Sequence, residues 1–228
     1  MYSTNCKFLR LTVFILCILI SHLAFAQGRG YFDNTPDRKF YGGVVGGLNF
    51  SALRGDNYTG YRKAGLNVGG TVFVRLMPKL FTSIELIYTQ KGCRGIRVFE
   101  SYYTGTFIEK YIVNLNYFEL PIMLHYQLND KWNAGFGAAY AGLVNYKEEV
   151  FTDQPFVFTA DKYAFNNDEI SFIINANMQF YKGWFLGMRY QQSLATIREQ
   201  QNIPFQFSNG SASQLNQLFS LRLIYLID

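Results

Sequence analysis

The chain has 228 residues, of which 21 are basic and 16 acidic, giving a formal net charge of +5 at pH 7. Lys and Arg are scattered without a run or stripe, which excludes a nucleic-acid-binding surface. Aromatic residues make up 18% of the chain and there are 20 glycines, a composition that suits a single β-rich exported domain.

Residues 1–26 predict a secretory signal peptide. Two basic residues and an apolar run occupy 7–20, and Ala24-Phe25-Ala26 places small residues where signal peptidase cleaves. We therefore expect cleavage between Ala26 and Gln27, a periplasmic N-terminal tail at 27–37 and an outer-membrane barrel domain at 38–228. A transmembrane anchor is the alternative interpretation, but the apolar run is shorter than the roughly 18 residues that a membrane helix needs.

Eight segments then alternate apolar and polar residues with period two, the pattern of a strand with two different faces. The pattern is weaker in the first and fifth segments, which are rich in Gly and Ala. Short connections alternate with long ones, as in transmembrane barrels with tight periplasmic turns and long extracellular loops. The sequence therefore predicts an all-β fold, an eight-stranded antiparallel up-and-down transmembrane β-barrel. Its expected strands are 38–50, 64–76, 80–91, 111–128, 132–145, 168–180, 184–194 and 214–228, with short turns at 77–79, 129–131 and 181–183 and long loops at 51–63, 92–110, 146–167 and 195–213.

Charged and aromatic residues distinguish a membrane barrel from a soluble barrel of the lipocalin type, whose apolar face points inward. The cores of the eight segments contain five charges, fewer than a wall exposed to water would normally carry, so we expect the apolar face to contact lipid. Aromatic residues near both ends of the segments predict two interfacial girdles. The girdle residues are Trp132 and Trp184 directly after short turns, and Tyr88, Tyr140 and Tyr190 farther along.

The polar face of the segments predicts a lumen filled by side chains. Eight strands leave an interior just large enough for side chains, and charges buried there need partners. We expect a network that plugs the barrel, in which Glu119 pairs with a lumenal arginine. A proton or ion path along the same charges is the alternative. The expected network comprises Arg75, Glu85, Glu119, His125, Arg189 and Arg222.

Segment 111–128 is unusually long. Asn114 and Asn116 fall on its lipid-facing register, above the expected height of the upper girdle. We therefore expect this strand and its neighbour to rise above the membrane as a β-hairpin wall on the outside.

The sequence gives little support for catalysis or metal binding. His125 is the only histidine after the signal peptide, and no Ser/His/Asp arrangement can be assembled around it. The acidic pairs 148–149 and 168–169 could form a Ca²⁺ site, but we interpret them as carboxylates in a loop that are exposed to solvent. Because the other two cysteines lie in 1–26, an intramolecular disulfide is excluded, and we expect Cys93 to be an idle thiol at the edge of a loop. We predict a non-enzymatic protein with no metal and no cofactor.

The long loops contain more aromatic residues than an inert loop needs. Such side chains, together with Arg, are enriched where proteins bind partners. Packing of the loops on one another to cap the barrel is an equally supported alternative. The candidate contact residues are Arg97, Phe99, Tyr102, Tyr103 and Phe107 in 92–110, and Phe156 and Phe158 in 146–167.

Four stretches carry a family resemblance. They are Gly46-Gly47-Leu48-Asn49-Phe50-Ser51, Ala64-Gly65-Leu66-Asn67-Val68-Gly69, Glu85-Leu86-Ile87-Tyr88-Thr89-Gln90-Lys91-Gly92 and Tyr117-Phe118-Glu119-Leu120-Pro121-Ile122. In this order they resemble the PorT-type outer-membrane β-barrel family of Bacteroidetes, and the last stretch is the most diagnostic. The resemblance implies an eight-stranded outer-membrane barrel, and most family members have no assigned activity. The namesake takes part in type IX protein secretion.

We therefore expect a monomeric barrel in the cell outer membrane, surrounded by lipid and lipopolysaccharide. Its expected role is structural or binding, through extracellular loops that contact a protein or glycan. An accessory role in secretion or envelope assembly is the second interpretation, and it requires periplasmic partners at 27–37 or at the short turns. An outer-membrane enzyme that depends on His125 is the third.

Overall fold

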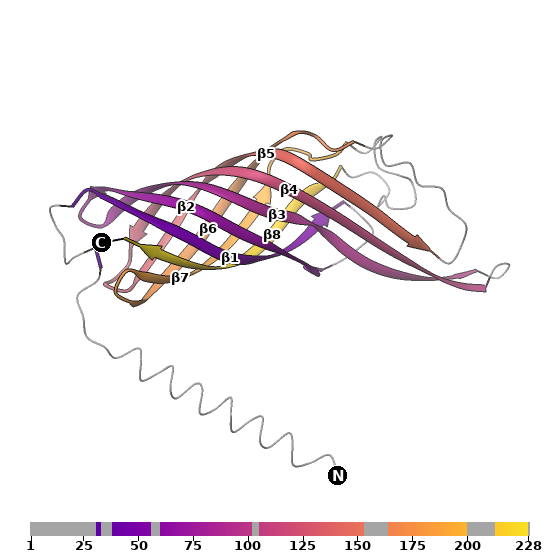
Figure 1. Ribbon diagram of the computed structural model, residues 1–228, viewed down its shortest axis with the longest axis horizontal. Helices are drawn as coiled ribbons and strands as arrows, with labels where there is room; N and C mark the ends of the chain where they lie inside the picture. Colours follow the sequence, from indigo (N-terminus) through magenta and orange to yellow (C-terminus); the bar gives the residue numbers. More distant parts are fainter. Residues whose placement is uncertain are drawn as a thin grey trace, which may run out of the picture.

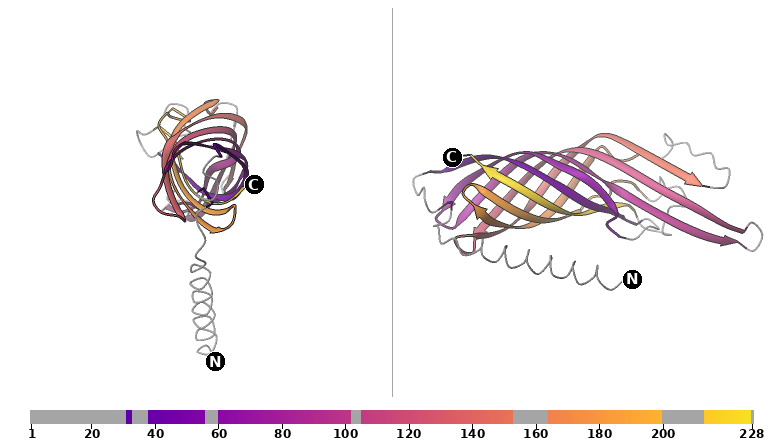
Figure 2. Two further views of the ribbon diagram at one scale, coloured as in Figure 1. Left: turned by 90° about the vertical axis from the view of Figure 1, so that its left-hand side faces the viewer. Right: turned by 60° about the horizontal axis from the view of Figure 1, so that its bottom comes forward.

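The computed structural model describes residues 31–32, 38–55, 60–101, 105–152, 164–199 and 213–227, with only the backbone at 97–101 and 105–109. Eight strands form one closed barrel in which each strand pairs antiparallel with its sequence neighbours and β8 closes on β1 (Figures 1 and 2). The predicted fold class is confirmed. The strands are β1 (Phe40–Arg54), β2 (Lys63–Met77), β3 (Leu80–Ser101), β4 (Gly105–Gln127), β5 (Trp132–Thr152), β6 (Asp168–Tyr181), β7 (Trp184–Ser193) and β8 (Leu215–Leu226).

The two faces of the wall differ in the sense expected of a membrane barrel. Leu86 on β3 and Met188 on β7 are about 60% exposed, whereas the neighbouring Glu85 and Arg189 are only 2% exposed. A soluble barrel would show the opposite polarity, so the lipocalin alternative is wrong. Among the described residues, no helix has the length and apolar character that crossing a membrane requires.

Three strands continue well beyond the rest of the barrel. β3 pairs with β4 up to Ser101↔Gly105, whereas its described pairing with β2 ends at Thr89. β5 follows β4 up to Thr152. We call residues 90–101, 105–116 and 145–152 the extension, which Figure 1 shows reaching far past the ends of the other strands. The predicted projecting hairpin is therefore present, and its place outside the cell stays a prediction. The expected loop boundaries at 92–110 and 146–167 are wrong because both segments contain paired strand.

Small residues allow neighbouring strands to approach closely inside the barrel. A Cβ atom added to Gly137 on β5 would lie 2.1 Å from the carbonyl oxygen of Ile122 on β4. Real Cβ atoms do not approach backbone this closely, so an alanine there would push the two strands apart. Gly42 on β1 differs, since a Cβ added there meets nothing within 4 Å.

Replacing Gly137 with Ala is expected to lower the free energy of unfolding by about 1–3 kcal/mol, the usual cost of overfilling a packed site. Urea unfolding of the detergent-solubilised protein measures the loss. Gly42→Ala is the matched control and should change stability by less than about 0.5 kcal/mol. Equal losses for the two variants would contradict the steric explanation.

Candidate functional site

The first charged cluster in the lumen joins β3, β7 and β8. Arg189 Nη2 and Arg222 Nη2 both donate to the same oxygen, Glu85 Oε2, at 2.9 and 2.7 Å. All three side chains are at most 2% exposed. One carboxylate therefore serves two guanidinium groups, which leaves this cluster with one excess positive charge.

The second cluster has the opposite composition. Lys91 Nζ on β3 lies 3.0 Å from Glu119 Oε2 on β4 and 2.8 Å from Glu169 Oε1 on β6. Gln191 donates to Glu119 at 2.9 Å, and Asn216 donates to Glu169 at 2.6 Å. This cluster carries one excess negative charge, so the two clusters together are neutral.

The salt-bridge partner of Glu119 differs from the expected one. It is Lys91 and not an arginine. The sequence interpretation placed Lys91 at the end of its strand, outside the charged core, although its position on the same face as Glu85 was a usable signal. In the structure β3 continues past Lys91, which lies wholly inside the barrel with 0% exposure.

The two remaining network candidates have hydrogen-bond partners outside the two clusters. His125 Nε2 shares a hydrogen bond with Ser83 Oγ at 2.7 Å, and its ring lies 4.9 Å from that of Phe73. Arg75 Nη2 donates to the hydroxyl of Tyr41 at 2.8 Å and also to the carbonyl of Phe32. Both side chains therefore belong to the polar packing of the barrel at the end with the short turns.

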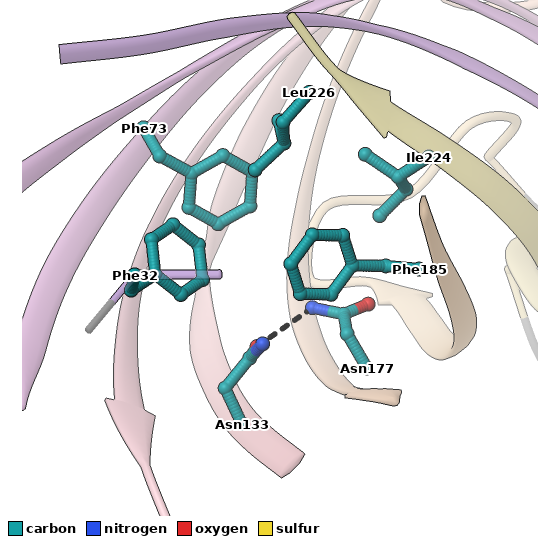
Figure 3. A pocket seen from close by; sticks show the side chains of 7 residues that line it. All are labelled: Phe32, Phe73, Asn133, Asn177, Phe185, Ile224 and Leu226. Atoms are coloured by element: carbon teal, nitrogen blue, oxygen red, sulfur yellow. Dashed lines mark hydrogen bonds between the residues drawn. The ribbon is translucent and has the colours of Figure 1, made fainter. Parts of the chain in front are cut away.

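The short-turn end of the barrel is closed by two residues that precede β1. Tyr31 and Phe32 are 4% and 5% exposed. Figure 3 shows the Phe32 ring facing Phe73 and Phe185, whose centroids lie 6.0 and 5.6 Å away. The amide of Tyr31 donates to Gln179 Oε1 at 2.8 Å. The segment expected as a tail at 27–37 thus contains a plug, and the space around Phe32 has no room for a water molecule.

The opposite end is covered by residues that follow β5 and β7. Arg198 binds Glu148 in a bidentate ion pair, with nitrogen to oxygen distances of 3.0 and 2.7 Å and both side chains 0% exposed. The Arg198 guanidinium carbon lies 3.5 Å from the ring centroid of Phe165. Backbone hydrogen bonds between Ile197 and Gln214 and between Asn166 and Ile197 fix the cover. The capping alternative for the loops is supported for these residues.

Glu148 was interpreted as solvated loop charge, and that interpretation is wrong. Tyr111 donates a further hydrogen bond to Glu148 Oε1. Burial, followed by the Glu148 carboxylate, raises the pKa of Tyr111 well above 10. The stability gained from neutral Tyr111 is therefore complete below about pH 10 and is lost as the pH rises through the raised pKa. Cys93 is also buried in this cluster, within β3, and not at a loop edge.

The aromatic candidates for the girdles all lie on the outward face. Trp132 and Trp184 begin β5 and β7 at the short-turn end. On the other side of the apolar band, Tyr88 pairs with Phe118, Tyr140 with Leu120 and Tyr190 with Phe219. The two interfacial girdles that these residues would form stay a prediction.

The loop candidates are only partly described. Arg97 and Phe99 belong to β3 and Phe107 to β4, and the register pairs Phe99 with Phe107. These three residues are thus on the extension and not in a loop. Tyr102, Tyr103, Phe156 and Phe158 lie outside the described residues.

Residues 25–199 match the family described as "Outer membrane protein beta-barrel domain". The chain belongs to this family. No curated protein sequence matches it. Among solved structures, Ail of Yersinia pestis is 10% identical, with 83% of this chain and 100% of that chain covered and a TM-score of 0.43. OprG from Pseudomonas aeruginosa is 9% identical, with 83% and 96% covered and a TM-score of 0.39.

In a member of this outer-membrane family, the exposed apolar wall is the surface that faces lipid. Ser83 and His125 are 0% and 1% exposed, so their hydrogen bond does not face any opening. In the described parts of the chain, no three His, Cys, Asp or Glu side chains come together in a way that could hold a metal ion. The extension, in contrast, continues past the described pairing of the other strands.

Proposed function

We propose that the chain is a monomeric, non-enzymatic barrel of the PorT type, which uses the extension to bind a protein or glycan at the cell surface. The signal peptide is removed at Ala26/Gln27, and the short turns face the periplasm. The observation that carries this proposal is the contrast between the two parts of the molecule. The lumen holds two charged clusters, with Tyr31 and Phe32 buried at one end and Arg198 at the other, whereas β3, β4 and β5 continue as a sheet outside it.

An accessory role in type IX secretion or envelope assembly is the second candidate. It requires contacts with periplasmic partners through residues 27–37 or the short turns. Tyr31 and Phe32 are buried in their own barrel and are therefore not available for such contacts, whereas the turn at Asp130 is exposed.

Photocrosslinking in intact cells tests the two roles. A photoreactive residue replaces Ile96 on the extension, which is 54% exposed, or Asp130 in a short turn. Leu186 on the lipid-facing wall, 46% exposed, is the control position. Adducts from Ile96 that are absent from Leu186 are expected. Protein adducts from Asp130 alone would instead favour the secretion or assembly role and contradict binding through the extension.

A further inference from the structure

The outward-facing residues of β4 change from apolar to polar between Phe118 and Asn116. From Leu128 to Phe118 the outward residues are apolar or aromatic, and the next two outward residues are Asn116 and Asn114. Ten residues rising about 3.3 Å each, in a strand tilted about 40° from the membrane normal, cover roughly 25 Å. This is the height of the apolar band of an outer-membrane barrel, so Asn116 lies just above the hydrocarbon boundary.

An amide row crosses the extension at this height. The register sets Gln90 on β3 beside Asn116 on β4, and Asn116 beside Asn145 on β5. Asn116 Nδ2 donates to Asn145 Oδ1, which orients both amides across the strands. Asn114 pairs with Lys147 in the next outward row. These side chains offer donors and acceptors in the plane where sugars of the outer leaflet begin.

Cations lie directly above the amide row. Arg94 on β3 pairs with Ile112 on β4 in the row beyond Asn114. Ile96 pairs with Lys110 in the row after that. Lys147 is bound to Glu149 at 2.6 Å, but no described carboxylate pairs with Arg94 or Lys110.

Lys63 at the start of β2 is close enough to Arg94 to feel its charge, although it stands on the inward register of its strand, beside Ser51. Burial, followed by the positive charge of Arg94, lowers the pKa of Lys63. Two cations therefore lie near each other at the edge of the extension, and Arg94 is exposed. In the part of the chain that the structure describes, Arg94 forms no ion pair and Lys110 lies 5.4 Å from the centroid of the Phe151 ring, so both can still bind an anion.

We propose that the outer face of the extension, formed by Gln90, Asn116, Asn145, Asn114, Arg94 and Lys110, binds the sugar–phosphate head group of one lipopolysaccharide molecule. This face continues the lipid-contacting wall upward, so the molecule beside it belongs to the outer leaflet. Amides hydrogen-bond sugar hydroxyls, and Arg and Lys bind phosphate through charge-assisted hydrogen bonds. The proposal rests on the proposed orientation, with the extension outside the cell.

The test measures the rise in melting temperature of the detergent-solubilised protein when rough lipopolysaccharide is added, since a ligand that binds the folded state stabilises it by mass action. The double variant R94S/K110S is expected to bind about tenfold more weakly or worse, because each lost charge-assisted hydrogen bond is strong. The variant K39S/K79S removes two exposed cations at the short-turn end and should bind like the wild type. Equal melting temperatures without lipid show that the variants fold.

Three results would overturn the proposal. They are equal lipopolysaccharide affinity of R94S/K110S and the wild type, equal weakening by K39S/K79S, and equal competition by phosphatidylglycerol, which would indicate a general anion surface. Weaker binding of lipid A without core sugars than of rough lipopolysaccharide is the expected outcome, because Arg94 and Lys110 lie in rows above the amides, beyond the first sugars. The measurement uses purified protein, so a failed crosslinking experiment in cells would refute the protein or glycan partner without affecting this result.

Discussion

Replacing Glu85 with Gln is expected to lower the free energy of unfolding by about 3–5 kcal/mol, the usual cost of removing one partner from a buried ion pair. Arg189 and Arg222 both use the same carboxylate oxygen, so a single substitution leaves two buried guanidinium groups without a counter-charge. Gln keeps the size of the side chain, and the loss therefore reports charge and hydrogen bonding without a cavity. Guanidinium or urea unfolding in detergent measures it.

Two controls separate this effect from a general loss of acidic residues. Glu149→Gln removes the partly exposed partner of the exposed Lys147 and should cost no more than about 1 kcal/mol. A triple variant in which Met replaces Glu85, Arg189 and Arg222 should recover most of the stability, because apolar side chains often replace buried ion pairs at little cost. A single Glu85→Gln variant within about 1 kcal/mol of the wild type would show that water or rearrangement compensates the two arginines.

Replacing Arg198 with Met is the second change with a large expected effect, again about 3–5 kcal/mol. Glu148 would keep the hydrogen bond from Tyr111 but lose both guanidinium contacts while remaining buried. The backbones of Arg198 and Gln214 also form a β-bridge. The loss of the ion pair should therefore appear as faster hydrogen exchange at the amides of Ile197 and Gln214. Denaturant unfolding gives the accompanying change in global stability.

The double variant Arg198→Met/Glu148→Leu completes this experiment as a double-mutant cycle. It should recover most of the loss, since no charge is then left buried without a partner. If the double variant is as unstable as the sum of the two single variants, the side chains act independently and the ion pair does not hold the cover in place.

The strand pattern could be predicted because its cause is local. Every second residue faces lipid or lumen, so period two revealed six of the strands and the inward side of Glu85, Arg189 and Arg222. The two Gly/Ala-rich strands were predicted from the alternation of short and long connections around them. The upper ends of β3 and β5 could not be found in this way. Above the membrane both faces contact polar surroundings or other protein, and the alternation of Arg94, Gly95 and Ile96 carries little hydrophobic contrast. Cross-strand pairing determines these segments.

The missed site residues depend on contacts distant in sequence. Glu148 and Arg198 are 50 positions apart, and neither lies in a segment with a clear apolar face. Phe32 precedes the first strand and packs against Phe185 and other residues contributed by late strands. Single-sequence patterns identify faces, but they contain no information about which distant segment covers them.

The position of Tyr31 and Phe32 also constrains the order of assembly. Their binding site includes Phe185 of β7 and Ile224 and Leu226 of β8, which are the last strands to be synthesised. The hydroxyl of Tyr31 donates to the carbonyl of Ile227 at 3.2 Å, across 196 positions of sequence. Tyr31 and Phe32 can therefore dock only after the final strand has joined the first one. Once docked, it holds the seam between β1 and β8 from inside, so that insertion of this segment marks a completed barrel and opposes reopening of the seam.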